Sequence, residues 1–500
     1  MKKILISSIA TSALLFTISC KTDFDQDVNS IVVTKGSADF SKYVAVGNSL
    51  TSGYSNGALY VDGQNESFPS MMANQMKLAG GGEFKQPLMS DNLGGIPSVG
   101  VGNKLILAVV NGALAPVPAS GVGTTTLANI FSSGPYQNMG VPGAKSFHLL
   151  APGYGSAAGL ATGTANPYFV RFSSSANATV LGDVMSQKPT FFSLWIGNND
   201  VLGYATSGGD DSNPITPTNT FSQAYGILVS TLISQGAKGV VANIPNVTSL
   251  PFFTTVPYNP VPLDQASVSA LNAQVFGPLK QILTAYGQGN RLQLLSLANN
   301  PLLLKDESLT NLSAQITGAL IQAGVSPQQA GLMGVVFGQA RHATAADLIP
   351  LTTSSVIGTA PSSPYAVSPF NKYGVTFPLE DKHVLRGKFG TGTDSEVDNV
   401  LTATTAFNGI IKSAADANNL AYVDANAKMI ELAGASGISF DGVKYTTKFV
   451  TGGTFSLDGV HLTGRGYGLI ANEFMKQINA KYGSTLPMVN INKYSGVKFP

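Results

Sequence analysis

Four short polar clusters in the sequence carry side chains that can do chemistry: 47–54 (GNSLTSGY), 138–144 (NMGVPGA), 197–200 (GNND) and 458–462 (DGVHL). Ser49 is a candidate nucleophile, and a serine nucleophile needs a base within hydrogen-bond reach that a carboxylate orients. Asp458 and His461 are three residues apart, so one turn of chain can bring the carboxylate to one imidazole nitrogen. The other nitrogen is then free for Ser49, which is the arrangement that acyl transfer requires.

Acyl transfer by a serine also needs fixed hydrogen-bond donors for the oxyanion of the tetrahedral intermediate. The backbone N–H groups of Ser49 and Gly143 and the side-chain amide of Asn199 are the candidate donors. These three residues lie in three different clusters, so the interpretation requires that the fold bring the clusters together.

A second serine offers an alternative nucleophile. Residues 53–57 (GYSNG) match G-x-S-x-G, the nucleophile elbow of α/β-hydrolases, with Ser55 at its centre. That elbow requires a strand to end at its first glycine, whereas the apolar run here ends at Val46. We therefore expect Ser55 to be a loop residue. The other histidines, His148, His342 and His383, have no comparable partner in the sequence and are expected to be structural.

Alternating strand and helix patterns would position the clusters. Buried apolar runs predict strands at 43–46, 190–196, 240–244 and 420–423, with a weaker candidate at 292–297. Helical spacing covers 264–286, 309–323, 394–417 and 466–482. Continuous apolar strands between helices predict an α/β fold with a parallel sheet covered on both faces. Ligands bind at the carboxyl ends of such strands, and polar residues follow three of the predicted ones.

The four clusters, in this order, resemble the conserved blocks of the SGNH (GDSL-type) hydrolase family. Ser49, Gly143 and Asn199 match the serine, glycine and asparagine blocks, and Asp458 with His461 matches the last block. The resemblance implies a flavodoxin-like three-layer α/β/α sandwich that hydrolyses carboxylic esters through an acyl-enzyme. It implies no metal and no organic cofactor.

The resemblance covers roughly residues 40–485 and leaves two departures. Asn48 stands where the family usually has Asp. Long stretches at about 80–134 and 250–393 are predicted to be insertions in the family's fold, and the second is a possible cap over the site. We therefore expect a single hydrolase domain at 36–485, enlarged by insertions, with a C-terminal extension at 486–500.

The amino terminus resembles that of a bacterial lipoprotein. A basic start and a short apolar run predict a signal peptide at 1–19, because the run is shorter than the roughly 20 residues that span a bilayer. Cys20 is the expected lipidation site, and 20–35 would be a flexible tether. The implied location is extracytoplasmic, on the membrane of a bacterial envelope, either periplasmic or surface-facing and expected at the outer membrane.

Charge and cysteine content exclude other classes of protein. The chain has 29 Lys and Arg against 27 Asp and Glu, a formal charge of +2. This balance argues against a nucleic-acid binder, which needs a basic face. Removing Lys2 and Lys3 with the signal peptide leaves 27 positive and 27 negative side chains. One cysteine excludes an intrachain disulfide framework and a cysteine zinc site.

The expected partner is a small-molecule, lipid or acylated-sugar ester, with membrane contact through the N-terminal lipid. Two alternatives remain open. The chain could be a non-catalytic surface lipoprotein that binds acylated glycans or lipids on the same fold, or an acyltransferase that uses the same triad.

Overall fold

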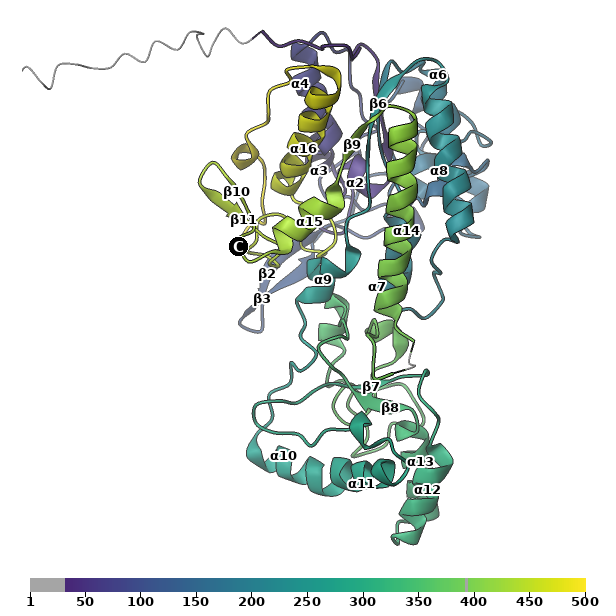
Figure 1. Cartoon of the computed structure of the whole chain (residues 1–500), viewed down its shortest axis with the longest axis vertical. Coiled ribbons are helices and arrows are strands. Elements are labelled where there is room, and N and C mark those ends of the chain that lie inside the picture. The colour runs from purple at the N-terminus through teal and green to yellow at the C-terminus, as the bar shows by residue number, and fades with distance from the viewer. Residues whose placement is uncertain (1–31, 392–393) are drawn as a thin grey trace, which may run out of the picture.

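The structure is a computed structural model that describes residues 32–391 and 394–500. The predicted signal peptide, Cys20 and tether residues 20–31 lie outside this part of the chain. A five-stranded parallel sheet of order β4-β1-β5-β6-β9 forms the centre of the larger part of the molecule (Figure 1). The strands are β1 (Tyr43–Gly47), β4 (Asn138–Gly140), β5 (Phe191–Trp195), β6 (Lys238–Ala242) and β9 (Ala421–Val423).

Helices cover both faces of this sheet, because alternate strand residues point to opposite sides. Val44 and Val46 of β1 pack in one apolar cluster, and Tyr43 and Ala45 pack in another. The first cluster includes residues of α6 (Val180–Ser186), α8 (Thr218–Ile233) and α14 (Glu396–Ala417), and the second includes α4 (Phe68–Leu78) and α16 (Gly464–Tyr482). The predicted α/β class with a parallel sheet is confirmed, and the layering is compatible with a three-layer sandwich.

The four main strand predictions are confirmed, but the candidate at 292–297 is wrong. Leu292 and Leu295 are buried there without forming a strand. The backbone N–H of Gln293 donates to His342 Nδ1 at 2.9 Å, and that of Leu295 donates to Asn272 Oδ1 at 2.8 Å. Side chains thus accept hydrogen bonds from these backbone N–H groups, which in a sheet would donate to the carbonyl groups of a neighbouring strand.

The four predicted helices are present, and several others were not predicted. Two of these, α8 and α13 (Pro327–Phe337), begin at or directly after a proline. Proline is favoured at helix starts, so this was an available sequence signal. The other helices of the larger part are α2 (Ser49–Ser52), α3 (Val61–Asn65), α5 (Pro167–Val170), α7 (Asn199–Thr206), α9 (Pro251–Thr254) and α15 (Ala425–Ala433). None of the helices within the described ranges is long and apolar enough to cross a membrane.

The predicted insertion at 80–134 contains a β-hairpin that the sequence reading missed. Strand β2 (Leu105–Val110) pairs antiparallel with β3 (Ala113–Pro118). Asn111 and Gly112 connect them, with φ of 51° and 80°. Positive φ at both central residues is typical of the turns that Asn-Gly favours in two-residue hairpins.

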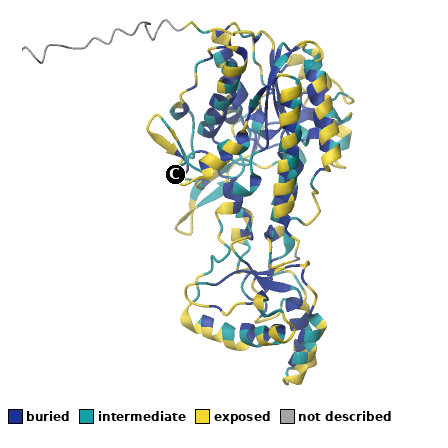
Figure 2. Ribbon diagram, viewed as in Figure 1, coloured by how far each residue is buried: buried dark blue, intermediate teal, exposed yellow. Residues whose placement is uncertain are grey.

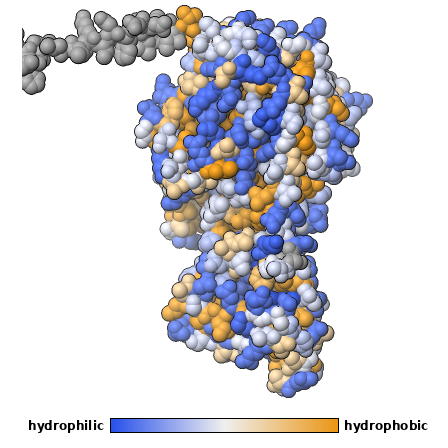
Figure 3. Space-filling model, viewed as in Figure 1, coloured by the Kyte–Doolittle hydropathy of each residue, from blue (hydrophilic) through white to orange (hydrophobic). Residues whose placement is uncertain are grey.

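Most of the predicted insertion at 250–393 forms a lobe with its own apolar core. Figure 2 shows buried residues within the lobe, and Figure 3 shows the surface narrowing between it and the larger part. The lobe lies beyond α7 and α9, which follow β5 and β6, so it faces the carboxyl ends of the strands (Figure 1). Whether it acts as a cap stays a prediction. Its elements are α10 (Gln265–Leu271), α11 (Gly277–Ala285), β7 (Leu303–Lys305), α12 (Ser313–Gln322), α13 and β8 (Ala340–His342).

A buried ion network holds the base of the lobe. Arg341 Nε donates to Asp306 at 2.6 Å, and its two Nη atoms donate to Asp347 at 2.8 and 2.7 Å. The side chains of Arg341 and Asp347 are fully buried, and that of Asp306 is 2% exposed. Arg386 extends the network to Glu396 at the start of α14.

We expect Arg341→Ala to lower the free energy of unfolding by about 3–5 kcal/mol, because it leaves two buried carboxylates without their main partner. Urea unfolding followed by circular dichroism measures this loss. Lys412→Ala is the matched control, since its pair with Asp416 is at least half exposed on both sides. Such surface pairs contribute at most about 1 kcal/mol. Equal losses in the two variants would contradict the prediction.

Both ends of the described chain bond to α16 or to the residues that follow it. The N–H of Thr34 donates to Thr485 Oγ1 at 2.8 Å, and the N–H of Thr485 donates to Thr34 O at 3.0 Å. The last residues of the predicted tether are therefore attached to the fold. In the C-terminal extension, Val489 exchanges two hydrogen bonds with the Asn472 side chain, at 2.8 and 3.0 Å.

Candidate active site

The turn after β1 presents Ser49 at the carboxyl end of the sheet. Asn48 caps α2, because its Oδ1 accepts from the N–H of Leu50 at 3.1 Å. Its amide donates to Asn198 Oδ1 at 3.4 Å, a bond that an aspartate at this position could not donate. Only glycine fits at Gly47, where a Cβ would lie 2.4 Å from the carbonyl oxygen of Trp195.

Ser49, His461 and Asp458 form one continuous hydrogen-bonded chain. His461 Nε2 lies 2.9 Å from Ser49 Oγ, and His461 Nδ1 lies 2.9 Å from Asp458 Oδ2. Ser49 and His461 are 412 residues apart in the sequence. With Nδ1 protonated toward the carboxylate, Nε2 is free to accept the serine proton.

Four further donors surround the Asp458 carboxylate. Its Oδ1 accepts from the N–H groups of Val460 and His461 at 2.8 Å each and from Ser456 Oγ at 3.1 Å. Its Oδ2 accepts from the N–H of Gly57 at 2.7 Å. Burial raises the pKa of this carboxyl, but the facing imidazole and the hydrogen bonds outweigh burial and hold the pKa well below its usual range. Asp458 is therefore a carboxylate at neutral pH.

The turn at 54–57 supports the histidine and its carboxylate together. The Tyr54 ring lies 4.6 Å from the His461 ring, centroid to centroid. The Tyr54 hydroxyl donates to Gly57 O at 2.5 Å, on the residue whose N–H holds Asp458. The contacts of Tyr54 and Gly57 with this pair were not predicted from the sequence. Tyr54 belongs to the first polar cluster, and both residues belong to the G-x-S-x-G match, which pointed to a different chemistry.

The candidate oxyanion donors follow three neighbouring strands, since Ser49 follows β1, Gly143 follows β4 and Asn199 follows β5. Gly143 has φ +80°, which favours glycine, and its N–H makes no hydrogen bond within the described ranges. The amide of Asn199 donates to Ala144 O at 2.9 Å, which ties it to the loop after β4.

Asp200 also binds the loop after β4, through two hydrogen bonds. Its two oxygens accept from the N–H and the hydroxyl of Ser146 at 2.9 and 2.8 Å. The sequence reading placed Asp200 in a cluster without giving it this role. The loop carrying Gly143 is thus joined to the start of α7, which carries Asn199.

The alternative nucleophile and the other histidines lie outside this chain of contacts. His461 bonds to Ser49, while Ser55 lies in a turn whose backbone pairs with Ala58. Burial and nearby Lys145 lower the pKa of His148 to about 4. Burial lowers the pKa of His342 to about 3, and burial with nearby Lys382 also lowers the pKa of His383. These three imidazoles are neutral at pH 7.

Helix α9, which leads from the larger part towards the lobe, contacts the segment that carries Asp458 and His461. The N–H of Phe252, in α9, donates to the carbonyl of Gly459 at 3.0 Å, between Asp458 and His461.

Comparison with known proteins gave no matching family model, no matching curated protein and no matching solved structure. The function proposed below is therefore based on the geometry of this site.

Proposed function

We propose that this protein is a serine ester hydrolase of the SGNH (GDSL) type that cleaves carboxylic esters through an acyl-enzyme. One observation carries the proposal: Ser49, His461 and Asp458 are joined by two contacts of 2.9 Å. Nucleophile, base and orienting carboxylate are the three parts that acyl transfer by serine needs. The three donors at adjacent strand ends support it.

In the proposed reaction, Ser49 Oγ attacks the ester carbonyl carbon while His461 Nε2 accepts the hydroxyl proton. The carbonyl oxygen becomes an oxyanion that accepts hydrogen bonds from Ser49, Gly143 and Asn199. The carbon–oxygen bond to the alcohol then breaks, and the imidazolium returns the proton to the departing oxygen. Water, deprotonated by the same imidazole, hydrolyses the acyl-serine and releases the carboxylic acid.

The proposal includes an extracytoplasmic lipoprotein held by acyl chains on Cys20. Lipid chains gain about 0.8 kcal/mol for each buried methylene, so two or more would hold the protein on a membrane. Mass spectrometry of membrane-extracted protein tests this part separately. A mature chain that begins at an acylated cysteine supports it, and an unmodified cysteine contradicts it.

A fluorophosphonate probe and a panel of p-nitrophenyl esters test the enzymatic proposal. We expect covalent labelling of Ser49 and release of p-nitrophenol, both absent in Ser49→Ala. A non-catalytic binding protein would show neither. An acyltransferase would label equally but transfer the acyl group to an added acceptor alcohol in preference to water, which product analysis detects.

Activity should rise with pH and then level off, because only a neutral imidazole can accept the serine proton. Histidine side chains generally change charge between pH 5 and 8. The pKa of Asp458 lies below its usual range, so this carboxylate stays charged across that interval. Measuring kcat/KM against pH with a neutral ester checks the expectation. A flat profile from pH 5 to 8 would contradict it.

Asn199→Ala should lower kcat by about 10²–10³, since the loss of one oxyanion donor has this effect in serine hydrolases. KM should change little if the donor acts mainly on the transition state. Asn246→Ala is a control for the substitution itself, because that side chain only caps a short helical turn. An unchanged kcat in Asn199→Ala would remove this residue from the proposed oxyanion site.

A further inference from the structure

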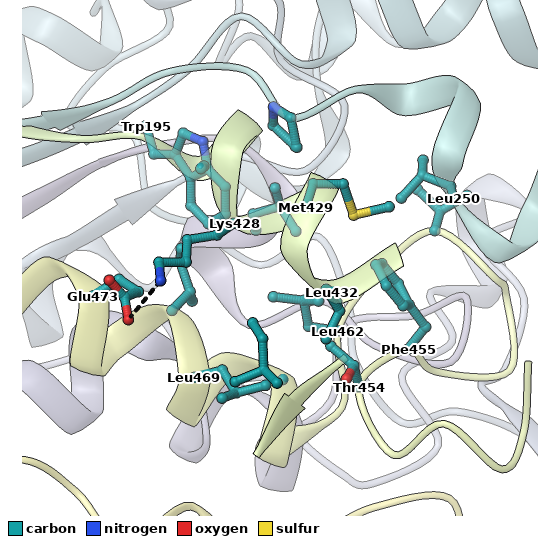
Figure 4. Close-up of a pocket in the computed structure, with 17 residues that line it drawn as sticks. Trp195, Leu250, Lys428, Met429, Leu432, Thr454, Phe455, Leu462, Leu469 and Glu473 are labelled. Atoms are coloured by element: carbon teal, nitrogen blue, oxygen red, sulfur yellow. Dashed lines mark ion pairs between the residues drawn. The ribbon is translucent and has the colours of Figure 1, made fainter. Parts of the chain in front are cut away.

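An apolar pocket lies behind the segment that carries His461. Figure 4 shows side chains from α15, α16 and the loops around them facing one space, including Met429, Leu432 and Leu469. Its space is about 690 Å³ when the open solvent at its mouth is included. Trp195, at the end of β5, forms part of the wall.

This pocket is separate from the reacting groups but shares a wall with them. Val460 and Leu462 line it, whereas His461 between them faces Ser49. Leu50, the residue after Ser49, also lines it. Within the described chain, neither Ser49 nor His461 belongs to the lining. A molecule bound here would contact Val460 and Leu462 rather than the hydroxyl of Ser49.

Polar groups in the lining are few. Lys428 contacts Glu473 at 3.7 Å and Glu431 at 2.8 Å, and its side chain is 36% exposed, so this ion pair marks the solvent side. Thr454 is buried at 2% exposure, and its hydroxyl has no hydrogen-bond partner within the described chain. Apolar walls with one free buried hydroxyl are typical of a site for a largely apolar small molecule.

We propose that this pocket binds an unbranched aliphatic chain, as in a fatty acid, with its polar end toward the solvent side that Lys428 and Glu473 mark. Sugars and nucleotides require many hydrogen-bond partners, and this lining offers almost none. Methylene groups, in contrast, gain free energy on leaving water for such walls. The proposal concerns binding alone, so it does not depend on the proposed esterase activity.

Titration of Ser49→Ala protein with dansylaminoundecanoic acid tests the proposal without interference from turnover. We expect saturable one-to-one binding with increased fluorescence. Dodecanoate should displace the probe better than octanoate, by about four-fold for each added methylene that is buried. Binding of the probe does not require catalytic activity. A negative result in this titration is therefore distinguishable from a negative result in the esterase assay.

Substitutions locate the site. Leu469→Trp, added to Ser49→Ala, fills the pocket and should weaken binding of the probe at least ten-fold. Ile430→Trp is the matched control on α15, since Ile430 is 62% exposed and outside the lining. Leu469→Lys, at a half-buried position, serves as a second variant if the tryptophan is not tolerated. Absence of saturable binding, or equal affinity in the Leu469 and Ile430 variants, would overturn the proposal.

Discussion

Replacing Ser49 with alanine is expected to lower kcat for p-nitrophenyl esters by about 10⁵–10⁶ and to abolish fluorophosphonate labelling. The variant removes Ser49 Oγ, which lies 2.9 Å from His461 Nε2. His461→Ala should lose about as much, and the double variant little more. Residues that act as one catalytic unit have strongly non-additive effects.

Ser55→Ala is the matched control, because it makes the same chemical change six residues along the chain. Its hydroxyl has no contact with His461, so activity should stay within a few-fold of the unmodified protein. Steady-state kinetics on Ser49→Ala, His461→Ala and Ser55→Ala test the assignment. Thermal unfolding establishes that each of these variants is folded. Full activity in Ser49→Ala would disprove it, and loss in Ser55→Ala alone would point to the elbow chemistry of α/β-hydrolases.

Asp458→Asn should lower kcat by about 10⁴ through the tautomer of His461. Three donors converge on Oδ1 of this carboxylate, so the amide oxygen of asparagine should take that position. The amide NH₂ then faces His461 Nδ1, which must accept a hydrogen bond and give up its proton. That proton moves to Nε2, so the nitrogen facing Ser49 can no longer act as a base.

In the unmodified protein, the N–H of Gly57 donates to Asp458 Oδ2 at 2.7 Å. In the variant this N–H would face the NH₂ group of asparagine, so that two donors would meet. We therefore expect a lower melting temperature together with the loss of activity. Asp416→Asn is the control, since that carboxylate is 62% exposed and should alter neither quantity. Activity within ten-fold of the unmodified protein would show that the carboxylate does not control the tautomer.

The parts of the site that follow strong local patterns were predictable from the sequence. The strand before Ser49 is a continuous apolar run, and the polar residues after it could be assigned to the carboxyl end of a sheet. The i, i+3 spacing of Asp458 and His461 predicted their contact, which the structure contains. Their catalytic roles stay a prediction.

Other features left no local pattern. Strand β4 has only three residues, including Asn138 and Gly140, so it read as a polar cluster although it forms one edge of the sheet. Gly57 holds Asp458 with a backbone N–H across 401 residues of sequence. Any residue type has that N–H except proline, and spacing over such a distance carries no periodicity. The lobe's core likewise depends on contacts between short elements.

The order of the site along the chain has a consequence for biosynthesis. Ser49, Gly143 and Asn199 lie within the first 199 residues, whereas Asp458 and His461 come 409 and 412 residues after Ser49. Ribosomal synthesis proceeds from the amino terminus at about 5–20 residues per second. A nascent chain therefore carries the proposed nucleophile for at least about 20 seconds before the proposed base is made. We expect a chain cut before residue 458 to keep the predicted oxyanion donors but to lack the groups that would activate Ser49.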